Sequence, residues 1–174
     1  MTRTRYKATE SEYPIFATGT CIDWLPLLKP DNTKQILIDT IINTQKVKQL
    51  KVYAIVIMHN HFHIIYSSCN PAKEIGNLKS FSARQIIQYY RNIGADNVLR
   101  KMQNACPEYR KDRTYKFWQE GYCPKQMYSL DVLAQKIDYI QWNPVRKGYV
   151  NDPCEWPWSS ANPDFEIKID MLEY

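Results

Sequence analysis

All three histidines of the chain lie in one short stretch, between Met58 and Ile65. His61 and His63 are two residues apart and are flanked by apolar, β-branched runs that predict strands. Because side chains alternate between the two faces of a strand, both imidazoles should project from one face and Phe62 from the other. Two imidazoles side by side on a strand can bind a metal ion. Two packed or surface histidines would explain the same pattern.

His59 is treated separately from this pair. It would share their face only if the strand already ran straight through Asn60. An asparagine between two apolar runs more often marks a turn, so the stretch predicts a β-hairpin with the turn near residues 59–60.

A second group of reactive residues follows later in the chain. Tyr139 and Asn143 are four residues apart, which places them on one face of a helix. Ile140 belongs to the predicted buried stripe of that helix, so Tyr139 should border the core. A phenol is a possible nucleophile and an amide oxygen a possible metal ligand. The alternative is a tyrosine at a packing boundary and an asparagine that caps the helix end.

The spacing of apolar residues and the positions of turn-forming residues predict the helices and strands that hold these side chains. The expected strands are 15–22, 51–58, 61–67 and 114–122, and the expected helices are 31 or 32 to about 50, about 72–92, and Ser129 to about Asn143. Residues 93–113 are predicted to be an exposed, charged loop with some helix, and 151–174 an irregular packed tail. The order β-α-β-β-α-β-α predicts an α+β fold, an antiparallel sheet with helices on one face, of the split βαβ, ferredoxin-like kind.

Composition places the 174 residues, 44% hydrophobic and 24% charged, among globular chains, and we expect a single domain over residues 1–174. The net charge of +5 is compatible with a polyanionic partner. The five cysteines are scattered and form no Cys-x-x-Cys pair, which favours reduced thiols in a cytoplasmic protein. No apolar window approaches the length of a membrane span, and we expect no membrane partner.

Four strings of the chain resemble a known family. His61-Phe62-His63 resembles the His-hydrophobic-His motif of the HUH single-strand endonucleases. The wider string Met58-x-Asn60-His61-Phe62-His63 is similar to the single-tyrosine transposases, particularly the branch associated with repetitive extragenic palindromes (REP). Three further strings resemble other blocks of that family: Phe117-Trp118-Gln119-Glu120-Gly121-Tyr122, Tyr139-Ile140-x-x-Asn143-Pro144-Val145-Arg146-x-Gly148-x-Val150 and Trp156-Pro157-Trp158-Ser159-Ser160. The blocks occur in the family's order.

The resemblance implies an enzyme that cleaves and rejoins single-stranded DNA through a 5′-phosphotyrosine intermediate. Its implied substrate is DNA with hairpin-forming palindromic sequences. Tyr139 would be the nucleophile, and His61, His63 and Asn143 would hold a divalent metal, magnesium or manganese. His59 stands where the family usually has proline, and we expect it to have no catalytic part.

Basic residues supply candidate contacts to DNA phosphates. They are Arg3 and Arg5 in a basic N-terminal arm, Arg84, Arg110, Lys111, Arg113, Arg146 and Lys147. Two other functions stay open at this point: a DNA-hairpin-binding protein without catalysis, and a metal hydrolase that uses water and a His-x-His-x-His site. The sequence is compatible with a monomer or a homodimer.

Overall fold

The computed structural model describes residues 13–106, 114–121 and 124–171 of the chain. Its elements are β1 (Ile15–Thr20), η1 (Ile22–Trp24), α1 (Asp31–Lys48), β2 (Lys51–Ile57), β3 (His61–Ser67), α2 (Pro71–Asn92), α3 (Asp96–Asn104), β4 (Lys125–Gln126), α4 (Leu130–Gln141), α5 (Asn143–Arg146) and η2 (Pro153–Glu155). The predicted α+β class is confirmed.

One antiparallel sheet has the strand order β2-β3-β1-β4. The hairpin of β2 and β3 turns at residues 58–60, as the sequence predicts. β1 lies on the other side of β3, in a register that pairs Thr18 with His63 and Thr20 with His61. This order is that of a split βαβ sheet, because β3 lies between β1 and β2 although α1 joins those two strands.

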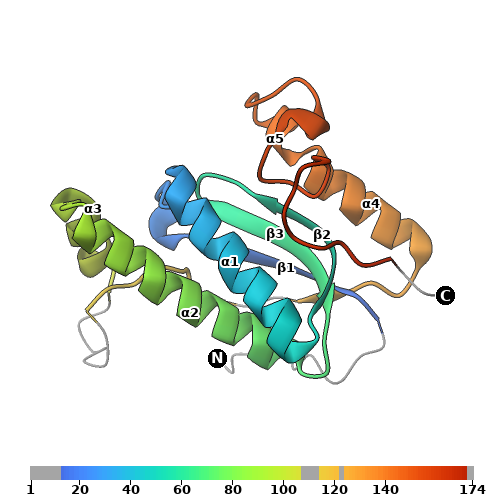
Figure 1. Cartoon of the computed structure of the whole chain (residues 1–174), viewed down its shortest axis with the longest axis horizontal. Helices are drawn as coiled ribbons and strands as arrows, with labels where there is room; N and C mark the ends of the chain where they lie inside the picture. Colours follow the sequence, from blue (N-terminus) through green and yellow to red (C-terminus); the bar gives the residue numbers. More distant parts are fainter. Residues whose placement is uncertain (1–12, 107–113, 122–123, 172–174) are drawn as a thin grey trace, which may run out of the picture.

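Helices cover both faces of this sheet (Figure 1). α1 and α2 pack on one face, where their apolar stripes meet Ile15, Phe62 and Ile64. α4 packs on the other face, where Ile140 joins a cluster with Ile65. The predicted antiparallel sheet is present, but α4 does not share the face of α1 and α2. The reason is that β1, β2 and β3 carry apolar side chains on both faces of the sheet, so helices have to cover each face.

Residues after η2 run along the open edge of β2. The backbone N–H of Ile57 donates to the Trp158 carbonyl at 2.8 Å, and Ser160 N–H donates to the Ile55 carbonyl at 2.9 Å. The Asp170 carboxylate accepts the N–H of Val52 at 2.9 Å. The irregular packed tail predicted from the sequence therefore covers a strand edge that would otherwise expose unpaired backbone groups.

The last strand differs from the prediction. β4 is Lys125–Gln126, and the described residues 114–121 form one isolated bridge, between Trp118 and Cys21, in place of a strand. The physical reason is that the consecutive side chains of Phe117 and Trp118 pack into the same core cluster, whereas successive side chains of a strand point to opposite faces.

The chain after the helix that carries Tyr139 differs from the prediction. α4 ends at Gln141, close to the predicted end, but a second, short helix, α5, begins at Asn143. Pro144 lies in the first turn of α5, where its missing N–H has no helical partner to lose. The proline therefore separates two helices and leaves Asn143 at the junction.

Two smaller points concern helices α1 and α3. α1 begins at Asp31, after Pro30 at the N-cap position, and the Asp31 carboxylate accepts from Lys34 Nζ at 2.7 Å. α3 fills part of the predicted 93–113 loop and buries Leu99 and Met102. No helix in the described ranges is long and apolar enough to cross a membrane.

Candidate active site

His61 and His63 lie on β3 with their rings on the α4 side of the sheet. Their ring centroids are 4.8 Å apart, and the residues are only 6% and 7% exposed. Phe62 between them packs into the opposite core, against Trp118. The alternation predicted for this stretch is thus present, and the pair is held on a central strand of the sheet.

Each of the two imidazoles uses one nitrogen to contact a neighbouring side chain. His61 Nδ1–H donates to the Asn60 amide oxygen at 2.7 Å. The Asn60 amide nitrogen in turn donates to the Trp24 carbonyl at 3.3 Å, which fixes the amide with its oxygen toward His61. His63 Nδ1 lies 2.8 Å from Thr18 Oγ1. When Nδ1–H is the donor in both rings, each Nε2 is a free acceptor, which is the arrangement of a metal-binding histidine.

The environment keeps both rings uncharged. Burial, with the positive charge of Lys147, lowers the pKa of His61 to about 4. Burial, with His61 and Lys136 nearby, lowers the pKa of His63 to about 3. A neutral imidazole is the form that ligates a metal, so the pair is available for that role at neutral pH.

Tyr139 reaches the histidine pair from α4. Its half-buried ring is 5.2 Å from the His63 ring and 6.2 Å from the Phe16 ring, centroid to centroid. Two cations lie over the same ring, Lys136 Nζ at 5.3 Å and Arg146 at 5.5 Å. Tyrosine and histidines therefore meet within one chain, in a positively charged setting suited to a phosphate.

Asn143 is buried at the junction of α4 and α5. It is 5% exposed, and its amide oxygen has no hydrogen-bond partner. Such an oxygen usually costs free energy, on the order of 1–3 kcal/mol, unless something binds it. A cation is a suitable partner for such an oxygen, and imidazole nitrogens and an amide oxygen are donors of the kinds that divalent metals bind.

His59 lies elsewhere. Its ring packs on Tyr149, at 4.6 Å, and on Trp156, at 5.7 Å, centroid to centroid. Among the residues that the structure describes, no three His, Cys, Asp or Glu side chains gather to hold a metal. A site made of all three histidines is therefore not present in this part of the chain.

The predicted DNA contacts fall into three groups. Arg146 is exposed and lies over the Tyr139 ring, and the next residue, Lys147, is exposed and contributes to the lowered pKa of His61. Arg84 is exposed on α2, over the Phe81 ring, on the layer that faces away from the histidines. The remaining candidates lie outside the described residues: Arg3, Arg5, Arg110, Lys111 and Arg113.

Sequence reasoning did not single out several residues of the site. Thr18 and Phe16 reach His63 from β1, and only the pairing register of β1 with β3 reveals this. Lys136 is one helical turn before Tyr139, a spacing that a search for cations near the tyrosine would have found. The sequence predicts a turn at Asn60, and nothing in it predicts the contact of this side chain with His61.

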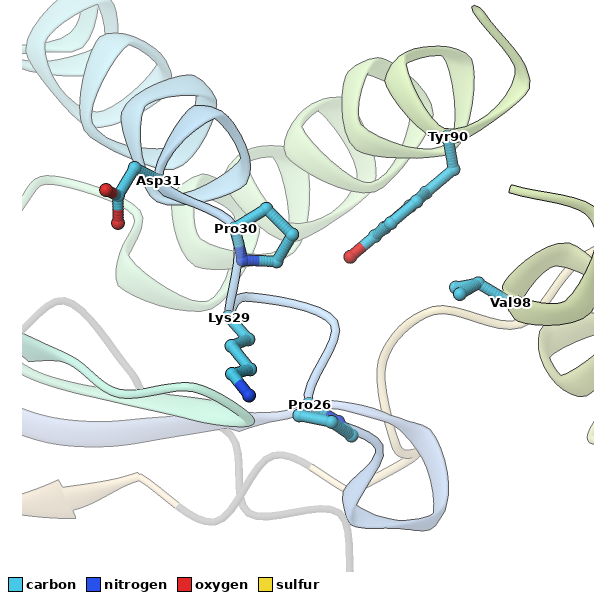
Figure 2. A pocket seen from close by; sticks show the side chains of 6 residues that line it. All are labelled: Pro26, Lys29, Pro30, Asp31, Tyr90 and Val98. Carbon is cyan, nitrogen blue, oxygen red and sulfur yellow. The ribbon is translucent and has the colours of Figure 1, made fainter. Parts of the chain in front are cut away.

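An open groove of about 500 Å³ lies apart from this site, in the α1–α2 layer (Figure 2). It is lined by Pro26, Lys29, Pro30, Asp31, Tyr90 and Val98. The Tyr90 hydroxyl donates to the Leu27 carbonyl at 2.9 Å, which ties α2 to the loop before α1. The groove contains none of the candidate catalytic residues.

Comparison with known proteins agrees with the resemblance expected from the sequence. The chain is 28% identical over 120 residues to a Haemophilus influenzae protein named as a REP-associated tyrosine transposase; the match covers 67% of this chain and 61% of that protein. The chain thus spans about three-fifths of the curated relative that it matches. No family model matches the chain.

A solved structure shares the fold. It is described as the REP-associated tyrosine transposase bound to a REP hairpin, and it aligns with a TM-score of 0.64 at 18% identity. The alignment covers all of this chain (100%) and 94% of that one. At this level of identity the likeness concerns the architecture, and it confirms the predicted fold class.

Proposed function

We propose that this chain, similar in sequence and in fold to REP-associated tyrosine transposases, is a transposase that cleaves and rejoins single-stranded DNA at hairpin-forming palindromes. The observation that supports this most directly is the meeting of Tyr139 with His61 and His63 inside one chain. The relative's name and the REP hairpin in the neighbouring structure support the choice of DNA.

In the proposed reaction the Tyr139 hydroxyl oxygen attacks a phosphodiester. The new bond joins this oxygen to phosphorus, the bond from phosphorus to the 3′ oxygen breaks, and the phenol proton is transferred, directly or through water, to the released 3′ oxygen, which becomes a 3′-OH. The product is a 5′-phosphotyrosine, which conserves the ester bond for rejoining by another 3′-OH. Lys136 and Arg146, both over the Tyr139 ring, would bind the phosphate and stabilise its charge in the transition state.

A divalent cation, magnesium or manganese, would be held by His61, His63 and Asn143. When bound, it would supply Lewis-acid polarisation of a phosphate oxygen. The neutral imidazoles and the amide oxygen without a partner support this assignment. Asn60 and Thr18 would keep the two rings in the orientation that presents Nε2.

Trapping the covalent intermediate tests the proposal. We would incubate the protein with an oligonucleotide that folds into a hairpin from the palindromes flanking the gene, with magnesium or manganese. A covalent protein–DNA adduct should form with the parent protein and be lost in Tyr139→Phe, because phenylalanine lacks the attacking oxygen.

Tyr128→Phe is the matched control. Tyr128 is 69% exposed and lies close to Gln126. Gln126 pairs with Ile15 at one end of β1, whereas His61 pairs with Thr20 at the other end, so Tyr128 is far from the candidate site. This variant should form the adduct as the parent does. An adduct that persists in Tyr139→Phe would contradict the assignment of the nucleophile. Hairpin binding without any adduct in the parent protein would indicate a DNA-binding protein without catalysis, and turnover without an adduct would indicate a hydrolase.

A further inference from the structure

The turn after β1 holds an exposed tryptophan in an unfavourable backbone conformation. Asp23 and Trp24 have φ values of 50° and 56°, both in the left-handed region. This region is unfavourable for residues that carry a Cβ, and more so for a bulky tryptophan than for an aspartate. Trp24 is nevertheless 58% exposed, and among the described residues it belongs to neither hydrophobic cluster. Burial of its ring therefore does not offset the cost.

This backbone conformation places the Trp24 ring against His61, one of the two histidines of the candidate site. The indole meets the His61 ring edge to face, at 5.9 Å between centroids. The Trp24 carbonyl accepts from the amide of Asn60, the residue that orients His61. The Trp24 backbone is also fixed by its own N–H, which donates to the Cys21 carbonyl at 3.1 Å. The ring is thus held beside the site, with much of its surface open to solvent.

The surroundings of this ring suit a single DNA strand. Arg146 and Lys147 are exposed, and Arg146 lies over the Tyr139 ring, which in turn contacts the His63 ring. Cations that bind a phosphate backbone, next to an exposed aromatic face, are the usual components of sites for unpaired nucleotides.

We propose that Trp24 is a stacking platform for an unpaired nucleobase of the DNA strand that enters the His61–His63 site. The inference rests on the proposed function and adds a specificity element to it: the enzyme would bind a hairpin more tightly when a single-stranded flank accompanies it. Stacking accepts every base, so the platform would recognise that the flank is unpaired and not its sequence.

The test measures binding without cleavage, with every variant made in a Tyr139→Phe background. The probes are the palindrome hairpin with a single-stranded flank, the same hairpin with a blunt end, and the flanked hairpin with abasic sites in the flank. Trp24→Gly should weaken binding of the flanked hairpin by about tenfold and leave the blunt one unchanged, since one stacked base contributes on the order of 1–3 kcal/mol. On the abasic flank the substitution should have no effect.

Three controls separate recognition from folding. Glycine favours positive φ, so Trp24→Gly should unfold at a temperature equal to or above that of the parent. Trp24→Phe keeps an aromatic face and should retain most of the flank dependence. Tyr128→Ala removes an exposed aromatic ring that follows β4, near the end of β1 that lies away from the site. It should change the affinity for none of the three DNA probes.

Equal affinity of Trp24→Gly and its parent for the flanked hairpin would overturn the inference, as would an equal loss on flanked and blunt DNA. So would a parent protein that does not distinguish the flank. Adduct formation by the chain with its native Tyr139 is measured separately. A protein that forms the adduct but shows no role for Trp24 keeps the proposed function and loses only this inference.

Discussion

The hydrogen bond between Thr18 and His63 leads to a prediction about metal affinity. Thr18→Val keeps the shape of the side chain and removes the oxygen that lies 2.8 Å from Nδ1. Without it the ring can turn and can place its proton on Nε2, so we expect manganese affinity to fall roughly 10- to 100-fold. Titration calorimetry would measure it. Thr44→Val, which removes a hydroxyl bonded to the Thr40 carbonyl in α1, should leave the affinity unchanged; an equal loss in both variants would rule out the positioning role.

The two histidines also predict how stability depends on pH. Burial lowers the pKa of His61 to about 4 and that of His63 to about 3, whereas the unfolded chain titrates near 6.5. Between these values the unfolded state binds more protons, so the free energy of unfolding should fall as pH drops below about 6.5. At about 1.4 kcal/mol per pKa unit, we expect a loss of roughly 2–4 kcal/mol from pH 7 to pH 5 in metal-free protein.

Urea unfolding at the two pH values would measure this loss. His63→Gln removes one of the two groups and should make the dependence on pH shallower, whatever it does to the stability at neutral pH. A slope that is the same in parent and variant would show that His63 does not carry the effect.

At the scale of single residues, the sequence predicts the candidate catalytic and metal-binding side chains better than it predicts the residues that contact them. The alternation around Phe62 and the four-residue spacing from Tyr139 to Asn143 follow from local periodicity. Thr18 and Trp24 could not be assigned, because their places beside His63 and His61 depend on strand register and on a turn with two positive φ values. Neither feature has a local pattern in the amino-acid order.

At the scale of the elements, the contact between β1 and β3 depends on a glycine. Gly19 pairs with Phe62, and a Cβ at position 19 would overlap the Phe62 ring. We expect Gly19→Ala to destabilise the protein by about 1–3 kcal/mol, as overpacking does, and to displace the Phe62 ring, which packs on the opposite face of β3 from the two histidines.

Gly76 provides the comparison. It lies in α2, and a Cβ there would have no heavy atom within 4 Å. Gly76→Ala should raise the free energy of unfolding by about 0.5–1 kcal/mol, because alanine favours a helix. Chemical denaturation would measure both variants. Two changes of the same sign would contradict the role given to the Phe62 ring.

Long elements with clear periodicity were predictable, and short ones were not. α1, α2, β2 and β3 agree with their predicted ranges closely. β4 has two residues, and the aromatic stretch at 114–121 resembles a strand in composition, although it buries only Phe117 and Trp118 and forms no strand. The side of the sheet that α4 covers depends on contacts among residues far apart in the chain, which periodicity does not specify.

At the scale of the molecule, the net charge of +5 and the cations around Tyr139 predict salt-dependent DNA binding. Lys147→Gln should weaken hairpin binding and reduce the slope of log affinity against log salt by about 1, the value for one phosphate contact. Lys48→Gln, in the last turn of α1, should leave the slope unchanged. Dissociation constants over a range of salt concentrations would decide; unchanged slopes in both variants would place the DNA away from α5.

The covered edge of β2 has a consequence for synthesis of the chain. The backbone N–H of Val52 is hydrogen-bonded to the carboxylate of Asp170, which lies 118 residues later in the chain. At about 5–20 residues per second, the ribosome needs on the order of ten seconds to make the segment that covers this edge. During that time the β2–β3 hairpin can form, with His61 and His63 already in place, while β2 still has an open side. We expect chaperones to bind the nascent chain in this interval, and the interval to set its tendency to aggregate.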